Sequence, residues 1–168
     1  MINPVRKKMR LAGWNYSSEG TYFLTICTKE RKALFSRIVG RGILDAPEVH
    51  LTGTGNCVHE AIAFLARKHT EIQIHHWVIM PNHVHILLSL QKTCESSIGA
   101  SGMPRPTDAV IPKLISSLKR FTNRKTQMDL WQDGYYDHIV RDEQDFLTRW
   151  QYIENNPAAW LEDDYYVD

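Results

Sequence analysis

The sequence predicts an α+β protein in which helices pack on an antiparallel, ferredoxin-like sheet. Two observations lead to this expectation. Segments rich in β-forming residues are interspersed along the chain with amphipathic helical segments, and two consecutive strands are joined only by Pro81 and Asn82. A connection of two residues makes the strands that it joins antiparallel neighbours. Helices interspersed with an antiparallel sheet are typical of the α+β class, and the order of the segments fits a ferredoxin-like arrangement.

The composition is that of one ordinary globular domain, with 168 residues, 43% of them hydrophobic and 23% charged. We therefore expect a single domain over residues 1–168. No apolar run reaches the length of about 18 residues that a membrane span needs, and the basic N-terminus lacks the apolar core of a signal peptide. Cys27, Cys57 and Cys94 are too widely spaced for a disulfide framework, which favours a reducing cytoplasm.

The elements of the first half follow from hydrophobic periodicity and from the placement of glycine and proline. In order, we expect a basic arm at residues 1–19, a strand at 22–28, a hairpin at 35–51, a helix at 58–68 and a strand at 71–80. Alternation in the last of these segments predicts that Ile72, Ile74, His76 and Val78 share one face. After Pro81 and Asn82, a second apolar run predicts the next strand, which carries His83 and His85.

The second half of the chain predicts two helices separated by an aromatic segment. In order, we expect a mobile loop at residues 91–108, a helix at 109–125, an irregular aromatic segment at 130–140, a third helix and an acidic tail at 158–168. Asp142 is a good N-cap for the third helix. That helix must end near Asn156, because Pro157 follows.

The charges are unevenly distributed, although the net charge of +1 argues against a general polyanion binder. Residues 113–125 contain five cations and no acid: Lys113, Lys119, Arg120, Arg124 and Lys125. Acidic residues are concentrated after Gln127. One basic surface can therefore coexist with a net charge near zero, and a solvated face of mixed charge is the alternative.

His83 and His85 are the first candidates for chemistry. Side chains at i and i+2 of a strand leave the same face, so the two imidazoles are expected side by side. This arrangement suits two adjacent ligands of one metal ion, and a hydrogen-bonded pair of histidines is the alternative. His75 and His76 are rival ligands, and for these two, as for His138, a structural role is favoured.

The third helix presents a second candidate surface. At about 100° per residue its core side holds Phe146, Trp150 and Ile153. A neighbouring stripe holds four polar side chains: Asp145, Arg149, Tyr152 and Asn156. Tyr152 and Asn156 are neighbours because they are four residues apart. Taken alone, Tyr152 is also explained as an amphipathic residue at the margin of a core.

Three segments together resemble a known family. PNHVHILL (residues 81–88), LWQDGYYDHIVRDE (130–143) and YIENNP (152–157) are similar in order and spacing to the REP-associated tyrosine transposases. These are single-tyrosine, insertion-sequence-200-like members of the HUH superfamily of single-strand endonucleases and transposases. The resemblance covers roughly residues 20–160, and the joint occurrence of the motifs is specific.

The resemblance implies a fold of the HUH-endonuclease type and a role for each motif. His83 and His85 match the histidines that bind a divalent metal, Tyr152 matches the nucleophile, and Asn156 matches a further metal ligand. Imidazole and amide ligands with open positions suit Mg²⁺ or Mn²⁺. The implied reaction is cleavage and rejoining of single-stranded DNA through a phosphotyrosine, which is linked to the 5′ side and leaves a free 3′-hydroxyl. Tyr135, Tyr136, Tyr165 and Tyr166 are competing tyrosines.

The implied partner is hairpin-bearing single-stranded DNA, bound by a monomer or a homodimer. Candidates for phosphate contacts are Lys113, Lys119, Arg120 and Arg124, together with the N-terminal arm. One alternative is a non-catalytic ferredoxin-like module that stacks bases on sheet aromatics such as Tyr22 and Phe23. Another is a metal-dependent hydrolase that uses water as its nucleophile.

Overall fold

The computed structural model describes residues 19–40, 47–91 and 110–166. The expected basic arm, apart from Glu19, and the expected loop at residues 91–108, apart from Gln91, lie outside these ranges. Within them, the structure holds no helix with the length and apolar character needed to cross a membrane.

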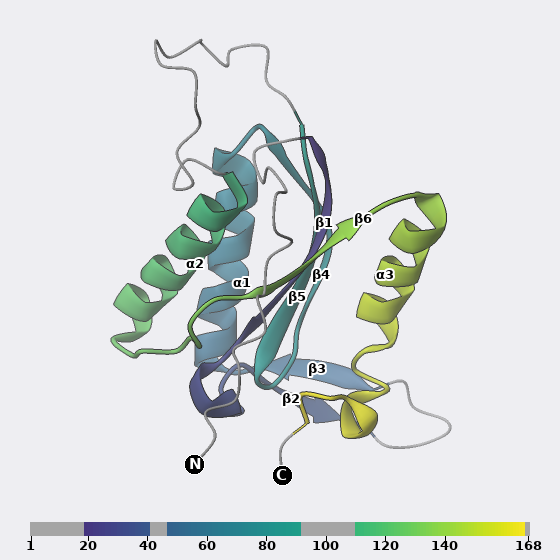
Figure 1. Cartoon of the computed structure of the whole chain (residues 1–168). Coiled ribbons are helices and arrows are strands. Elements are labelled where there is room, and N and C mark those ends of the chain that lie inside the picture. The colour runs from purple at the N-terminus through teal and green to yellow at the C-terminus, as the bar shows by residue number, and fades with distance from the viewer. Residues whose placement is uncertain (1–18, 41–46, 92–109, 167–168) are drawn as a thin grey trace, which may run out of the picture.

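One antiparallel sheet of four strands organises the molecule (Figure 1). Its strands are β1 (Gly20–Cys27), β4 (Ile72–Ile79), β5 (His83–Leu90) and β6 (Tyr136–Val140). They lie in the order β4-β5-β1-β6, and every neighbouring pair is antiparallel. With one helix before β4 and another before β6, this is the ferredoxin-like order, so the predicted fold class is confirmed.

The helices cover both faces of the sheet. They are α1 (Gly53–Lys68), α2 (Val110–Thr126) and α3 (Glu143–Asn155). Figure 1 shows α1 and α2 together on one side of the sheet and α3 alone on the other. The remaining elements are the hairpin β2 (Ser36–Val39) and β3 (Glu48–Leu51), and the short 3-10 helices η1 (Lys29–Arg31) and η3 (Trp160–Glu162).

Alternation along the central strands builds two cores of different size. In β5, Val84, Ile86 and Leu88 are buried in the large core under α1 and α2. The opposite face carries a smaller cluster under α3, in which Phe23 and Leu87 pack with Ile153. Because the large core fills one face of β1 and β5, the polar side chains of these strands have to lie on the opposite face. Helix α3 covers that face only in part.

The prediction that Ile72, Ile74, His76 and Val78 share one face of β4 is wrong. The pairing with β5 shifts between Ile74 and His76, which is a β-bulge. Ile72 and Ile74 pack in the large core, whereas Val78 packs in the cluster under α3. The extra residue reverses the alternation, a change that the apolar pattern alone does not reveal.

Two further boundaries differ from the expectation. Residues 136–140 form a strand that pairs with β1, although the segment at 130–140 was expected to be irregular. This strand is short, lies at the sheet edge and mixes polar with apolar residues, so it has no clear period. Helix α1 begins at Gly53 rather than near residue 58, because the Thr52 side chain accepts a hydrogen bond from the Gly55 N–H at 3.0 Å and caps the helix there.

Gly55 provides a test of how the start of α1 is packed. A methyl group at Gly55 would overlap the carbonyl oxygen of Phe35, whereas a methyl group at Gly53 would meet no atom within 4 Å. We expect Gly55→Ala to lower the free energy of unfolding by about 3 kcal/mol, since backbone must move. Gly53→Ala, the matched control, should leave stability unchanged or raise it by up to about 1 kcal/mol. Urea unfolding measures both, and equal effects would contradict this packing.

Candidate functional site

Helix α3 positions the candidate site across the face of the sheet that carries the two histidines. Asp142 caps its N-terminus by accepting a hydrogen bond from the Asp145 N–H at 2.8 Å, as predicted. Phe146, Trp150 and Ile153 pack against the sheet, and this contact fixes the rotation of the helix. Tyr152 is consequently directed along the sheet toward the histidines rather than away from it.

His83 and His85 lie side by side in the middle of this face. Their Nε2 atoms are 3.0 Å apart, and both side chains are almost fully buried. His83 Nδ1 lies 2.9 Å from the Asn82 side-chain oxygen, and His85 Nδ1 lies 2.8 Å from the Thr25 hydroxyl. Each imidazole therefore has its far nitrogen held by a neighbour and its Nε2 directed into the site.

The hydrogen bonds of Asn82 determine which His83 nitrogen carries the proton. The Asn82 amide nitrogen donates to the carbonyl oxygens of Arg31 at 3.1 Å and Tyr165 at 2.6 Å. Its side-chain oxygen must then accept from His83 Nδ1–H, which leaves a lone pair on His83 Nε2. Since two facing Nε2 atoms need one proton between them, His85 supplies it and Thr25 donates to His85 Nδ1.

Burial keeps both imidazoles neutral. It lowers the pKa of His83 to about 4, although Asp163 acts in the opposite direction. Burial, followed by the neighbouring His83, lowers the pKa of His85 well below its ordinary value. Neutral imidazoles with inward Nε2 atoms are the form that binds a metal cation.

Two oxygen-bearing side chains complete the cluster. Asn156 is buried at the C-cap of α3, and its amide nitrogen donates to an Asp163 carboxylate oxygen at 2.7 Å. The side-chain oxygen of Asn156 accepts no hydrogen bond from the part of the chain that the structure describes. Asp163, His83 and His85 each offer a ligand atom within 4.8 Å of the other two.

This donor set fits a divalent cation. Two neutral imidazoles, one carboxylate and one buried amide oxygen without a donor supply the mixed nitrogen and oxygen ligands that Mn²⁺ and Mg²⁺ accept. A buried oxygen with no donor is costly, and a cation would satisfy it. The residues present are thus suited to the metal that the resemblance implies.

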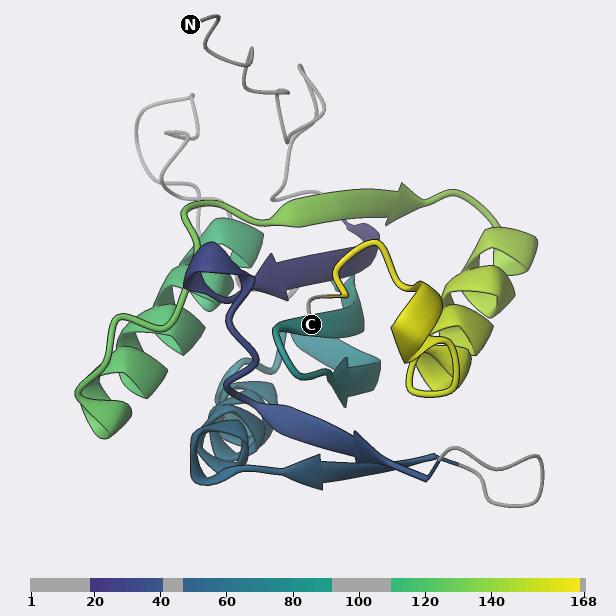
Figure 2. The same ribbon diagram turned by 90° about the horizontal axis from the view of Figure 1, so that it is seen from below.

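Asp163 was not among the residues predicted from the sequence. It belongs to the tail after α3, which Figure 2 shows running back from α3 toward the ends of β1 and β5. The tail is held there by Asn82, and by Arg31, whose guanidinium donates to the Asp164 carbonyl oxygen at 2.9 Å. In the sequence, only the acidic character of residues 162–164 pointed to Asp163. Thr25 and Asn82 were also missed, although Asn82 directly precedes the histidine pair.

Tyr152 borders the histidine pair from α3. Its ring centroid lies 5.2 Å from that of His85, in an edge-to-face arrangement, and the side chain is 41% exposed. Partial burial, and then the charges of Asp163 and Asp164, raise the pKa of the Tyr152 hydroxyl, whereas the Arg149 guanidinium lowers it. The Tyr152 side chain is therefore partly open to solvent, and its hydroxyl is not already ionised at neutral pH.

The competing tyrosines occupy different positions. Tyr165 is the nearest rival, with its ring 4.7 Å from that of His83, and burial raises its pKa to about 12. Tyr135 is buried in the large core, Tyr136 is exposed on the edge strand β6, and Tyr166 packs on Trp160. Tyr152 alone among these five is on a helix facing the histidines.

The other histidines lie outside the cluster. His75 Nε2 lies 2.7 Å from the Ser89 hydroxyl, and the ring of His76 stacks on Trp150. His138 is paired with Asp145, with 2.7 Å between Nε2 and the carboxylate. Each therefore has a neighbour outside the His83/His85 cluster.

The four predicted DNA-binding residues lie on α2, across the sheet from the histidines. Lys113, Arg120 and Arg124 are exposed. Lys119 instead donates to the carbonyl oxygens of Gln132 and Gly134, each at 2.6 Å, and burial lowers its pKa. Lys119 is engaged in holding the loop before β6, whereas Lys113, Arg120 and Arg124 lie on the exposed surface of α2.

Comparison with known proteins gives consistent results. Residues 16–156 match the family described as "Transposase IS200 like". An uncharacterized protein of Haemophilus influenzae (strain Rd) is 33% identical over 175 residues, which span 97% of this chain and 94% of that protein. The REP-associated tyrosine transposase of Escherichia coli K12 is 22% identical over 87% of this chain and 72% of its own length.

A solved structure supports the fold independently. A REP-associated tyrosine transposase bound to a REP hairpin superposes with a TM-score of 0.62, at 19% sequence identity. The match covers 90% of this chain and 74% of that one. It agrees with the antiparallel sheet and helix packing described above.

Binding of Mn²⁺ tests the donor set directly. We expect wild type to bind one Mn²⁺ and His83→Ala/His85→Ala to lose binding. Asp163→Asn should bind roughly ten- to a hundredfold more weakly, since it loses the only negative charge in the cluster. His50→Ala is the matched control, because His50 is exposed on β3 and pairs with Glu48. Isothermal titration measures the affinities. Equal binding by wild type and the double variant would rule out this site.

Proposed function

Because this chain belongs to the IS200-like transposase family, we propose that it cuts and rejoins hairpin-bearing single-stranded DNA through a covalent bond between Tyr152 and a DNA phosphate. The observation that carries this proposal is the convergence of four potential ligands and one tyrosine on one face of the sheet. His83, His85 and Asp163 lie close together, Asn156 donates to Asp163, and the Tyr152 ring lies against His85. These groups come from β5, from α3 and its C-cap, and from the tail that follows.

The proposed reaction is a transesterification at phosphorus. The Tyr152 oxygen loses its proton and forms a bond to the scissile phosphorus, and the bond from phosphorus to the 3′-oxygen breaks. The 3′-oxygen takes up a proton and leaves as a 3′-hydroxyl, while the 5′ side stays attached to the tyrosine. Attack by a 3′-hydroxyl on this phosphotyrosine reverses the step, so a strand is rejoined without a nucleotide cofactor.

The residues of the site divide the work. A bound Mn²⁺ or Mg²⁺ supplies Lewis-acid polarisation of the scissile phosphate and shields its charge. His83 and His85 are ready to hold such a cation because their Nε2 atoms face the site and Asn82 and Thr25 fix the two rings. Asn156 links the tyrosine helix to the cluster, so the spacing between nucleophile and ligands is set by a single helical turn.

We assign recognition of the hairpin to one surface of the protein and cleavage to another. Lys113, Arg120 and Arg124 lie on the exposed side of α2, on the face of the sheet opposite Tyr152. We assign to them contacts with the phosphates of a hairpin stem, while the single strand beside the stem passes the sheet edge to reach the site. Lys119 is left out of this set, since its ammonium group is held by two loop carbonyls.

The other two functions considered for the sequence are less well supported. A non-catalytic module that stacks bases on the sheet has no exposed aromatic platform at Tyr22 or Phe23, because both side chains are buried. A hydrolase that uses water would share the metal ligands but would need no tyrosine at the cluster. Replacement of Tyr152 distinguishes the two reactions, because cleavage through a phosphotyrosine needs its hydroxyl and hydrolysis by water does not.

Removal of the Tyr152 hydroxyl tests covalent catalysis. Wild type incubated with labelled hairpin-bearing single-stranded DNA and Mn²⁺ should give a protein–DNA adduct that survives denaturing electrophoresis. Tyr152→Phe should abolish the adduct while Mn²⁺ binding stays within about twofold, because the hydroxyl is not among the ligands. Tyr136→Phe, an exposed tyrosine on β6, is the control. An adduct formed by Tyr152→Phe points to Tyr165, and cutting without any adduct makes water the nucleophile.

The salt dependence of binding tests the surface on α2. Affinity for hairpin-bearing single-stranded DNA should fall with salt, with a log–log slope near −0.7 for each single-strand phosphate neutralised. Arg120→Gln/Arg124→Gln should make the slope shallower by roughly 1.8, since two contacts with the duplex stem are lost and each contributes about 0.9. Arg37→Gln/Arg67→Gln removes two exposed charges elsewhere and should leave the slope unchanged. Fluorescence anisotropy measures the slopes, and no difference between the two double variants would exclude this surface.

A further inference from the structure

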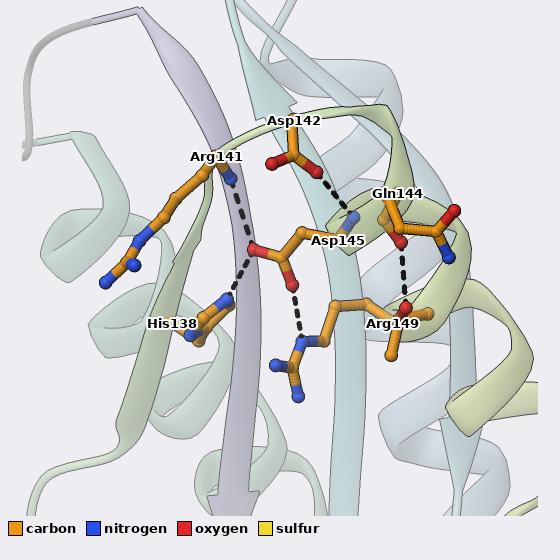
Figure 3. Close-up of polar contacts among 7 residues, drawn as sticks. His138, Arg141, Asp142, Gln144, Asp145 and Arg149 are labelled. Carbon is orange, nitrogen blue, oxygen red and sulfur yellow. Dashed lines mark hydrogen bonds and ion pairs between the residues drawn. The ribbon is translucent and has the colours of Figure 1, made fainter.

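A second group of charged residues lies beside Tyr152 on the same helix. Asp145, in the first turn of α3, accepts three hydrogen bonds that Figure 3 shows converging on its carboxylate. His138 Nε2 at 2.7 Å and the Arg141 backbone N–H at 3.2 Å share one oxygen, and Arg149 Nε donates to the other at 3.1 Å. The carboxylate is thus fixed from strand β6, from the connecting loop and from one helical turn further along α3.

Asp145 engages only the inner nitrogen of Arg149. The two terminal nitrogens make no hydrogen bond to any residue within the described ranges, and Figure 3 shows them directed away from the carboxylate. A guanidinium held through Nε presents its outer edge in a defined orientation, which is the geometry that binds a phosphate with two parallel hydrogen bonds.

The ring of Phe23 connects Arg149 with the candidate site. The Arg149 guanidinium carbon lies 5.7 Å from the centre of this ring. The same ring stacks on His85 at 5.1 Å and meets Tyr152 edge-on at 5.8 Å. Arg149, His85 and Tyr152 therefore border one aromatic ring, and Arg149 and Tyr152 are three residues apart on α3.

This arrangement places a cation where the reaction needs one. Because Arg149, His85 and Tyr152 border the same ring, a phosphate that reached both the Tyr152 oxygen and a cation held at His85 would come close to Arg149. Negative charge on the non-bridging oxygens has to be stabilised in phosphoryl transfer, and a preorganised guanidinium does this without rearrangement. Arg31, a second cation near the cluster, lies over the ring of Tyr165 and donates to the tail.

We propose that Arg149 binds a non-bridging oxygen of the scissile phosphate, and that Asp145, itself held by His138, positions it. This inference rests on the proposed function, because it assigns a further residue to the same reaction. Arg149 is then a catalytic residue, and Asp145 and His138 are positioning residues. None of these three side chains is among the proposed metal ligands.

The first experiment measures the rate of adduct formation at saturating DNA. Arg149→Gln should slow the adduct by roughly a hundredfold, the usual effect of losing one donor to a developing charge. Arg149→Lys should recover part of this loss, because it keeps the charge but not the two parallel donors. Arg67→Gln, an exposed arginine on α1, controls for the loss of one positive charge. A rate for Arg149→Gln equal to that of Arg67→Gln would overturn the proposal.

Asp145→Asn tests positioning. It should lower the rate at saturating DNA while the dissociation constant for the hairpin changes by less than about twofold, since α2 supplies that affinity in the proposed function. In the double variant Asp145→Asn/Arg149→Gln, the loss should be no greater than in Arg149→Gln alone. Additive losses would show that Asp145 acts independently of Arg149 and would remove it from this role.

A binding experiment separates this inference from the proposed function. In the Tyr152→Phe background, which cannot form the adduct, Arg149→Gln should weaken binding of a short single-stranded oligonucleotide by about tenfold or more in the presence of Mn²⁺. Failure of wild type to form any adduct would reject covalent catalysis, yet this measurement would still test whether Arg149 binds phosphate. Unchanged affinity in Arg149→Gln together with an unchanged rate would reject the role of Arg149. Equal thermal melting of the variants and their parents would exclude unfolding as the cause of either loss.

Discussion

The pairing register of β1 with β5 is the constraint on which the candidate site depends. It sets Thr25 opposite His85 and Cys27 opposite His83, so the hydroxyl that holds the second imidazole comes from the neighbouring strand. A slip of one residue would turn both imidazoles into the large core and bring Val84 and Ile86 out under α3. Burial of the alternate apolar side chains on β1 and β5 excludes that slip, since each is worth roughly 1.5–3 kcal/mol when fully buried. The apolar core thus fixes the register that the polar face requires.

Periodicity and local signals predicted the elements that form the site, and they did so for physical reasons. The i, i+2 spacing of His83 and His85 fixes their common face on any strand, and the cap at Asp142 with the stop at Pro157 fixes the extent of α3. The rotation of α3 then follows from its apolar side. Rules of this kind depend on backbone geometry that is the same in every protein.

What the sequence could not predict depends on contacts between distant segments. Asp163 reaches the histidines only because the tail folds back and is tied to Asn82 and Arg31, which lie at the ends of other elements. The bulge in β4 is set by its pairing with β5, and the side of the sheet that α2 covers is set by topology. The sequence revealed the cationic residues of α2 as a cluster. Charge alone could not show how far this cluster lies from the site, or that two loop carbonyls hold Lys119.

The Thr25 hydroxyl gives the site a further property. It donates to His85 Nδ1, while the His85 Nε2 proton lies between the two rings. If His83 and His85 held a cation through their Nε2 atoms, His85 would carry its proton on Nδ1, and the same hydroxyl would accept where it had donated. Both rings would keep their hydrogen-bond partners, because the hydroxyl hydrogen can reorient. The hydrogen bonds around the two imidazoles therefore suit either tautomer of His85.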